Sequence, residues 1–152
     1  MDERAEIYFH PAEETLWYRF KPHRGMTGPP GLAHGGFCAS ILDEAMGGIV
    51  WLSGNMALAA RLDFRYHAPV KLNRVHYVRA RVIKTDRRRI RAEATLIRSP
   101  NTSLVRAEGL FLRAGEDRLG KLPENLKKLL AFHEHRSRGM TPAQALRALA
   151  DE

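Results

Sequence analysis

The sequence predicts an α+β fold in which an antiparallel β-sheet wraps around one long central α-helix. Two observations carry this prediction. The mainly apolar segment Phe37–Leu52 is interrupted by a pair of acidic residues and has the length of a helix. After it, the spacing of apolar residues changes from the helical period of about 3.6 to the strand period of about 2, through four successive segments. A sheet with one apolar face needs a cover, and this helix is the only long hydrophobic element available.

The composition is that of an ordinary globular domain. The chain has 152 residues, of which 44% are hydrophobic and 28% charged, so a disordered or fibrous chain is excluded. A chain of this length buries enough surface for one core without metal or disulfide bonds. Lys and Arg number 25 against 17 Asp and Glu, which gives a net charge of +8. This excess favours an anionic partner such as nucleic acid, an acidic membrane surface or a phosphorylated small molecule.

The single cysteine, Cys38, excludes an intramolecular disulfide and a zinc site built on paired cysteines. We therefore expect a cytoplasmic protein in a reducing compartment, with no bound metal. The first residues, Met1–Glu6, are mixed in charge and are followed by no apolar region, unlike a signal peptide. The segment Phe37–Leu52 is too short for an unaided membrane span, so we expect no membrane insertion.

The elements up to the helix have local signatures. Thr15–Lys21 alternates apolar and polar residues, which predicts a strand. Pro22–Gly31 contains three prolines and three glycines, which predicts an ordered loop. The helix is predicted from about His34 or Gly35 to Leu52, where a Ser-Gly-Asn sequence ends it.

Four consecutive strands are predicted after the helix, joined at Pro69–Arg74, Asp86–Arg88 and Ser99–Thr102. We expect them to pair in chain order as an antiparallel meander. One face is apolar, and the other is a lattice of arginines and acids whose ion pairs contribute about a few tenths of a kcal/mol each. The predicted inward residues are Leu62, Phe64, Tyr66, Val78, Ala80, Val82, Ile90, Ala92, Ala94, Leu96, Val105, Ala107, Gly109 and Phe111, and the outward acids are Asp63, Glu93 and Glu108.

The tail differs in character from the sheet. Pro123–Arg136 has leucines at helical spacing, and Thr141-Pro142-Ala143-Gln144 has the form of a capping box with proline at the first helical position. Two short amphipathic helices are therefore predicted. We expect residues 1–114 to form the main domain and residues 115–152 a helical extension of the same domain.

The predicted helix is apolar on both sides. At about 100° per residue, a set of residues opposite Asp43 is expected to face the sheet, and a set of mostly small residues surrounds Asp43 itself. A second subunit is the most economical cover for that other side, which would hold Asp43 and Glu44 near a subunit interface. A carboxylate at such an interface is a candidate site residue. Alternatively, the acidic pair lies in solvent where the covering subunit ends. The predicted sheet-facing residues are Phe37, Cys38, Ile41, Ala45, Gly48, Ile49 and Leu52, and those around Asp43 are Gly36, Ala39, Ser40, Met46, Gly47 and Val50.

Glycines lead into this helix, in the segment Gly31–Gly36. They let a ligand approach the backbone, and the free N–H groups of a first helical turn stabilise negative charge. Asp43 follows two turns later. Hydrogen-bond donors that stabilise an oxyanion, with a carboxylate further along the same helix, suit the attack of water on a carbonyl group. The alternative is a His-Gly-Gly turn that only caps the helix.

The segment His34–Gly47, preceded by Gly28-Pro29-Pro30-Gly31, resembles the His-Gly-Gly…Asp motif of hotdog-fold acyl-CoA thioesterases. The resemblance is to the phenylacetate-degradation (PaaI-like) type within the 4-hydroxybenzoyl-CoA thioesterase superfamily. Leu62–Val70 is similar to the strand of that family that ends in Tyr-x-x-Pro, and Ala80–Lys84 is similar to its next strand. The match extends from about residue 15 to residue 113.

The resemblance implies a hotdog fold, a homodimer with composite sites at the subunit interface, frequent pairing into tetramers, and hydrolysis of acyl-CoA thioesters. It implies that the Gly36 N–H polarises the thioester carbonyl, that Asp43 is the general base or the nucleophile, and that His34 lies near the thioester. CoA is then part of the substrate, and no separate cofactor is expected. Gly35, Ser40 and Glu44 are further candidates for substrate contact.

The chain departs from the family pattern at two positions. Gly28 stands where many relatives have Asn, and Ala59 stands where many have Ser or Thr. Both changes remove groups that position water or substrate, for which Ser40, Glu44 or Asn55 could substitute. The alternative function is therefore a non-catalytic acyl-CoA-binding hotdog protein.

A basic hairpin turn is the remaining candidate. Lys84, Arg87, Arg88 and Arg89 could hold the phosphates of CoA, because guanidinium groups match phosphate oxygens, or they could form a solvated turn. A nucleic-acid partner is not expected, because the aromatic residues fall mostly on the predicted core faces and the arginines of the strands alternate with acids.

Overall fold

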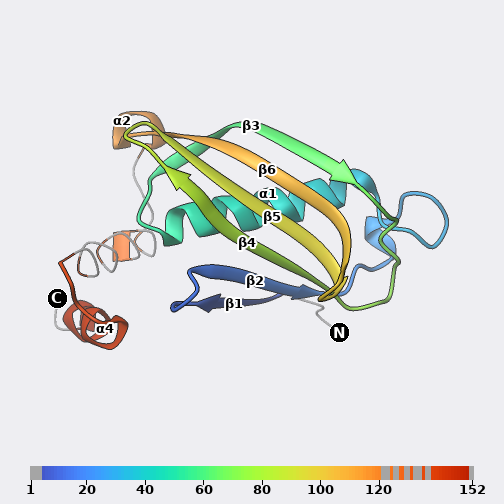
Figure 1. Cartoon of the computed structure of the whole chain (residues 1–152), viewed down its shortest axis with the longest axis horizontal. Helices are drawn as coiled ribbons and strands as arrows, with labels where there is room; N and C mark the ends of the chain where they lie inside the picture. Colours follow the sequence, from blue (N-terminus) through green and yellow to red (C-terminus); the bar gives the residue numbers. More distant parts are fainter. Residues whose placement is uncertain are drawn as a thin grey trace.

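The computed structural model describes residues 5–120 and 138–150, together with residues 124, 127, 128, 131 and 135. It contains a six-stranded antiparallel sheet in the order β1-β2-β4-β5-β6-β3, with the helix α1 (Gly35–Leu52) lying along one face (Figure 1). The predicted helix bounds are confirmed. The strands are β1 (Glu6–His10), β2 (Thr15–Phe20), β3 (Ala57–Tyr66), β4 (His76–Thr85), β5 (Arg89–Ser99) and β6 (Thr102–Arg113).

The predicted four-stranded meander is correct for β4, β5 and β6 but wrong for β3. β3 pairs with β6 and forms one edge of the sheet, so the chain crosses the end of the sheet before it enters β4. The β3–β4 connection is not a hairpin, because its backbone forms hydrogen bonds with other segments. The His67 N–H donates to the Leu104 carbonyl, and the Val70 carbonyl accepts from the Ala33 N–H. These bonds attach the connection to β6 and to the loop before α1.

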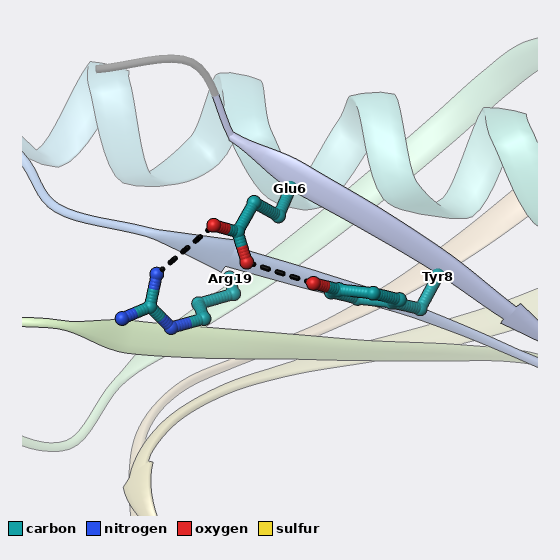
Figure 2. A network of polar contacts seen from close by, with 3 residues as sticks. All are labelled: Glu6, Tyr8 and Arg19. Atoms are coloured by element: carbon teal, nitrogen blue, oxygen red, sulfur yellow. Dashed lines mark hydrogen bonds and ion pairs between the residues drawn. The ribbon is translucent and has the colours of Figure 1, made fainter.

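The opposite edge, β1, was not predicted, because its alternation is weak and most of its side chains are exposed. It pairs with β2 through a short turn in which Glu14 has a positive φ of 50°. Figure 2 shows a polar contact on this hairpin: the Glu6 carboxylate accepts hydrogen bonds from the Tyr8 hydroxyl at 2.8 Å and from Arg19 Nη1 at 3.3 Å. All three side chains are well exposed to solvent, so backbone pairing rather than this network holds β1 in place.

The core lies between α1 and the sheet, and its position corrects the predicted helix orientation. Met46 and Val50, expected on the side away from the sheet, are completely buried, as is Leu42. The buried arc is centred about 100° from Asp43 rather than opposite it. The prediction placed the carboxylate directly away from the sheet, whereas the curved sheet covers one flank of the helix and leaves the flank of Asp43 open. Of the predicted sheet-facing residues, Cys38, Ala45 and Ile49 are buried and Phe37, Ile41, Gly48 and Leu52 partly buried.

In the tail, the last predicted helix is confirmed as α4 (Pro142–Ala150). Its capping box is reciprocal: the Thr141 N–H donates to Gln144 Oε1 at 2.8 Å, and the Gln144 N–H donates to Thr141 Oγ1 at 3.3 Å. A short helix, α2 (Glu116–Leu119), follows β6. The helix predicted over Pro123–Arg136 lies mostly outside the described residues. In the described part of the chain, no helix is long and apolar enough to cross a membrane.

A buried histidine beneath the crossover connection predicts a pH dependence of stability. His76 Nε2 lies 2.9 Å from the Lys71 carbonyl oxygen and must donate to it, while the buried Nδ1 has no partner within the described residues. Burial lowers the pKa of His76 below its usual 6.5. Below about pH 6.5 the unfolded chain binds a proton that the folded chain does not, so stability falls as the pH falls. We expect the free energy of unfolding in urea to decrease more between about pH 7.5 and 5.5 in the wild type than in His76→Gln. Equal decreases would contradict this assignment.

Candidate active site at the start of the central helix

The loop before α1 holds the first turn of the helix from both sides. A single 3-10 turn, η1 (Arg24–Met26), supplies the Met26 carbonyl, which accepts from the His34 N–H at 2.7 Å. On the other side, the Ala33 N–H donates to the Val70 carbonyl at 2.8 Å. Gly31 turns the loop with a φ of 77°, in the left-handed region that favours glycine. The predicted Pro/Gly loop is therefore an ordered support for the helix start.

Gly28 is required by a close backbone approach within this loop. A Cβ atom at this position would lie 2.9 Å from His34 Cα and 3.3 Å from His34 N, both of which are backbone atoms. The Asn implied by the family pattern does not fit here unless the loop moves. The departure at Gly28 is therefore coupled to the local path of the backbone.

This contact predicts the effect of a side chain at position 28. Gly28→Ala should displace the backbone of His34 and lower the free energy of unfolding by about 1–3 kcal/mol. Gly25→Ala is a suitable control, because the three atoms nearest to its Cβ would all belong to the side chain of His23 rather than to the backbone. Urea unfolding monitored by circular dichroism measures both variants. A Gly28→Ala protein as stable as the wild type would show that the loop is not tightly packed there.

The amide predicted to bind the thioester oxygen already has a partner. The Gly36 N–H donates to His34 Nδ1 at 2.9 Å, so His34 caps the helix through its own side chain. The capping ring is neutral and carries its proton on Nε2, because a doubly protonated ring has no acceptor. Among the described residues, the Gly35 and Phe37 N–H groups have no hydrogen-bond partner. The helix start therefore offers two free amides and a third that is occupied by a side chain that can rotate.

Tyr66, at the end of β3, also contacts the helix start. Its hydroxyl donates to the Gly35 carbonyl at 2.8 Å, and its ring lies 3.6 Å from where a Cβ of Gly35 would be. The side chain is 53% exposed, so it forms a rim rather than part of the core. Sequence reasoning noted the Tyr-x-x-Pro pattern but did not name Tyr66 as a site residue. The pattern itself was the signal that could have identified it.

Asp43 lies two turns into α1 on the flank left open by the sheet. Gly36, Ser40 and Asp43 are exposed and follow one another along this flank, and Glu44 is exposed beside them. The Ser40 hydroxyl donates to the Gly36 carbonyl at 2.8 Å, so its proton is committed while its oxygen can still accept. The structure thus brings Gly36, Ser40, Asp43 and Glu44 onto one surface. It does not enclose Asp43 within a single chain, and enclosure by a second chain stays a prediction.

Glu44 faces a buried hydroxyl beneath this flank. Burial raises the pKa of Tyr18 to about 12, and the negative charge of Glu44 contributes in the same direction. Tyr18 is therefore a neutral hydroxyl at any physiological pH.

The basic hairpin lies at the other end of the molecule from the helix start. The Arg113 N–H donates to the Arg88 carbonyl, and Trp51, in the last turn of α1, donates through Nε1 to the Ala57 carbonyl at 3.0 Å. The β4–β5 turn therefore sits at the carboxyl end of α1, as Figure 1 shows. The helix is about 27 Å long. Within one chain, Lys84 and the three arginines from Arg87 to Arg89 do not come together with His34, Gly36 and Asp43.

The site contains no thiolate and no evident metal site. Burial raises the pKa of the Cys38 thiol, so this cysteine is not an activated nucleophile. Among the residues that the structure describes, no three His, Cys, Asp or Glu side chains are grouped so as to hold a metal ion. The chemistry available is that of backbone amides, one imidazole, two carboxylates and the hydroxyls of Ser40 and Tyr66.

A curved antiparallel sheet over one helix, whose glycine-rich start is followed by a carboxylate, places the molecule among hotdog-fold proteins. Residues 30–105 match the model of the thioesterase superfamily, and the chain belongs to that family. This region contains the helix start, Asp43 and the basic hairpin. The predicted fold and family are therefore confirmed.

Individual relatives agree with this family. The chain is 31% identical over 107 residues to acyl-coenzyme A thioesterase THEM4 of Xenopus laevis, a match that covers 70% of this chain and 47% of the relative. The chain thus spans about half the length of the curated relatives it matches. A crystal structure of a thioesterase superfamily protein has a TM-score of 0.68 and 25% identity, covering 71% of this chain and 53% of the other.

A second solved structure contains coenzyme A. It is a hypothetical thioesterase from Streptococcus pneumoniae TIGR4, with a TM-score of 0.68 and 17% identity. The match covers 74% of this chain and 87% of that one. At this identity the likeness shows the shared fold.

Proposed function

We propose that the protein is an acyl-CoA thioesterase, which converts a CoA thioester and water into a carboxylate and CoA. The observation that carries this proposal is an exposed helix start, with free Gly35 and Phe37 amides, that is followed two turns later by the exposed carboxylate of Asp43. The acyl-CoA thioesterase activity in the name of the Xenopus relative supports it. We further propose a cytoplasmic location, in line with the single free cysteine, and no cofactor apart from the CoA of the substrate.

The helix start would stabilise the charge that develops on the thioester oxygen. The Gly35 and Phe37 amides are free, and the Gly36 amide becomes free when His34 rotates away from its cap. Such donors, together with the positive end of the helix dipole, favour the tetrahedral oxyanion more than the neutral carbonyl. His34 would then lie beside the thioester, with its Nε2–H available as a donor.

Asp43 would supply the base or the nucleophile. As a base, it takes a proton from water while the water oxygen attacks the thioester carbon, the C–S bond breaks and CoA leaves as the thiolate. As a nucleophile, its oxygen attacks the carbon and displaces CoA, and water then hydrolyses the resulting anhydride. Ser40 and Glu44, on the same flank, would contact the substrate or the attacking water.

The site would be completed by a second copy of the chain. β3 is an edge strand of ten residues with exposed apolar side chains at Leu58 and Tyr66, a surface suited to pairing with another strand. A two-fold axis that pairs two β3 strands in antiparallel fashion brings the carboxyl end of one α1 near the start of the other. We propose that this homodimer covers Asp43. Association of two such dimers into a dimer of dimers is a further prediction of the family resemblance.

The same two-fold symmetry would bring the basic hairpin of the partner to the site. The β4–β5 turn lies at the carboxyl end of α1, so the turn of the partner would approach the start of this helix. Lys84 and Arg87–Arg89 would then bind the phosphates of a CoA molecule whose thioester is held by the other chain. In this arrangement each site takes its carboxylate from one chain and its phosphate ligands from the other.

Thiol release tests the proposed reaction. The purified protein should release CoA from at least one member of a panel of short, long and aromatic acyl-CoA thioesters, detected with a thiol reagent. The panel also identifies the acyl group, which depends on the pocket between the two chains. Release no faster than that of buffer across the panel would overturn the proposal.

The occupied Gly36 amide favours one alternative, a protein that binds acyl-CoA without hydrolysing it. If His34 stayed in its capping position with substrate bound, only the flanking amides could polarise the carbonyl. Calorimetry would then show binding of a CoA thioester, while the thiol assay showed no turnover. Rapid thiol release excludes this alternative.

A further inference from the structure

A groove on the outer face of the sheet, away from α1, takes no part in the proposed reaction. It has a volume of about 730 Å³ and is formed by β2, β4 and the hairpin between β5 and β6. Two half-buried aromatic residues, Trp17 and Tyr77, line it, and three exposed arginines surround them: Arg79, Arg98 and Arg106. Aromatic surface and guanidinium groups thus meet in one depression.

The positive charge of this groove is not neutralised. No Asp or Glu lines it, and none of its three arginines forms an ion pair within the described part of the chain. Arg106 also lies directly opposite Arg65 in the β3–β6 register, where like charges repel.

The neighbouring row of the same face is different. Arg81, two residues along β4 from Arg79, is paired across the strands with Glu93. Asp63, in the same row, is paired with Arg61 of its own strand. One cross-strand ion pair, Arg81–Glu93, therefore forms in this row, whereas the row that crosses the groove contains no acidic residue. The arginines of the groove are therefore left to bind an anion from outside the chain.

The register arranges the aromatic and basic groups in a line. Trp17, Arg79, Thr95 and Arg106 are successive partners across β2, β4, β5 and β6. This row covers three strand spacings, about 14 Å. The Arg79 guanidinium lies 5.8 Å from the centre of the Trp17 ring. An aromatic ligand ring placed near Trp17 would have its substituents directed along the line that contains Arg79 and Arg106.

The groove also holds an unused polar atom. Ser103 Oγ is buried and has no hydrogen-bond partner among the described residues. A buried hydroxyl without a partner costs free energy, so a ligand group that binds it is favoured.

We propose that this groove binds a nucleotide with two or more phosphates. The base stacks on Trp17 and Tyr77, since base–aromatic stacking tolerates any base, and Arg79, Arg98 and Arg106 bind the phosphate oxygens. A free nucleoside polyphosphate and the nucleotide end of CoA share this chemistry. The site is on the opposite face of the sheet from Asp43, so it does not depend on the proposed hydrolysis.

Tryptophan fluorescence tests this site. Trp17 and Trp51 are the only tryptophans, so Trp51→Phe leaves Trp17 as the single reporter. Titration of that protein with ADP should quench its fluorescence to saturation. In the same background, Arg79→Gln combined with Arg106→Gln should weaken ADP binding at least about tenfold, because two charge-assisted contacts are lost. Arg81→Gln, on the same strand and face, is the matched control and should change the dissociation constant less than about twofold.

Competition with CoA identifies the source of the nucleotide. If CoA displaces ADP from the groove, the groove binds the nucleotide end of CoA at a place separate from the basic hairpin that the proposed function assigns to the substrate. If CoA does not displace it, the ligand is a free nucleotide. Both results support the site, provided that circular dichroism shows all variants folded. The proposal is overturned if ADP gives no saturable quenching, or if the double variant binds ADP as tightly as Arg81→Gln does.

Discussion

Replacing Asp43 with asparagine should lower kcat/KM for CoA thioester hydrolysis by about 100- to 10,000-fold, the range typical of losing a general base. Asparagine keeps the size of the side chain, but its amide neither takes a proton from water nor attacks a carbonyl carbon. Because Asp43 is exposed on the helix surface, the substitution should leave the fold intact. The rate is measured by thiol release with the best acyl-CoA of the panel.

The control for this experiment is Glu108→Gln. Glu108 is an exposed carboxylate on the outer face of the sheet and forms no ion pair within the described residues. The substitution removes the same charge at a distance from the helix start. The activity of the Glu108→Gln protein should therefore stay within about twofold of the wild type. Hydrolysis by Asp43→Asn at a near-wild-type rate would remove Asp43 from the mechanism.

Leu42→Ala should have the largest effect on stability, lowering the free energy of unfolding by about 2–5 kcal/mol. Leu42 is 0% exposed and lies at the centre of the helix arc that packs against the sheet. Truncation removes buried apolar contacts and leaves a cavity that the surrounding strands fill only in part. Urea unfolding monitored by circular dichroism measures the loss.

Ile7→Ala is the control for Leu42→Ala. Ile7 is 58% exposed on the edge strand β1, and its truncation should change stability by less than about 0.5 kcal/mol. A loss below about 1 kcal/mol for Leu42→Ala would mean that α1 does not pack against the sheet through this arc.

Local patterns were sufficient to predict most of the elements. The bounds of α1 follow from its glycine-rich start and its Ser-Gly-Asn end, and the capping box of α4 is visible in four residues. The inward residues of β5, such as Ile90 and Leu96, follow from strict alternation. In each case the information lies within about ten residues, which is the range over which periodicity and capping act.

Contacts distant in sequence could not be predicted in this way. The place of β3 beside β6 depends on a crossover connection that the loop before α1 holds in position. The predicted helix orientation was wrong because this helix is apolar on both sides, so an apolar residue such as Met46 fits either side. Only the curvature of the sheet decides which flank is covered. At the site, the glycine pattern identified the helix start, but the bond between Gly36 and His34 depends on a side-chain rotamer, which sequence does not encode.

A mixed dimer tests the central claim, that two chains share each hydrolytic site. One chain carries Asp43→Asn, and the other carries Arg87→Gln, Arg88→Gln and Arg89→Gln; the two are co-expressed with different tags and purified through both. Each pure variant should be impaired. If the carboxylate and the phosphate ligands come from different chains, one of the two sites in the mixed dimer is intact, and about half of the wild-type activity returns. A mixed dimer no more active than its parents would contradict a shared site, and so would a triple variant as active as the wild type.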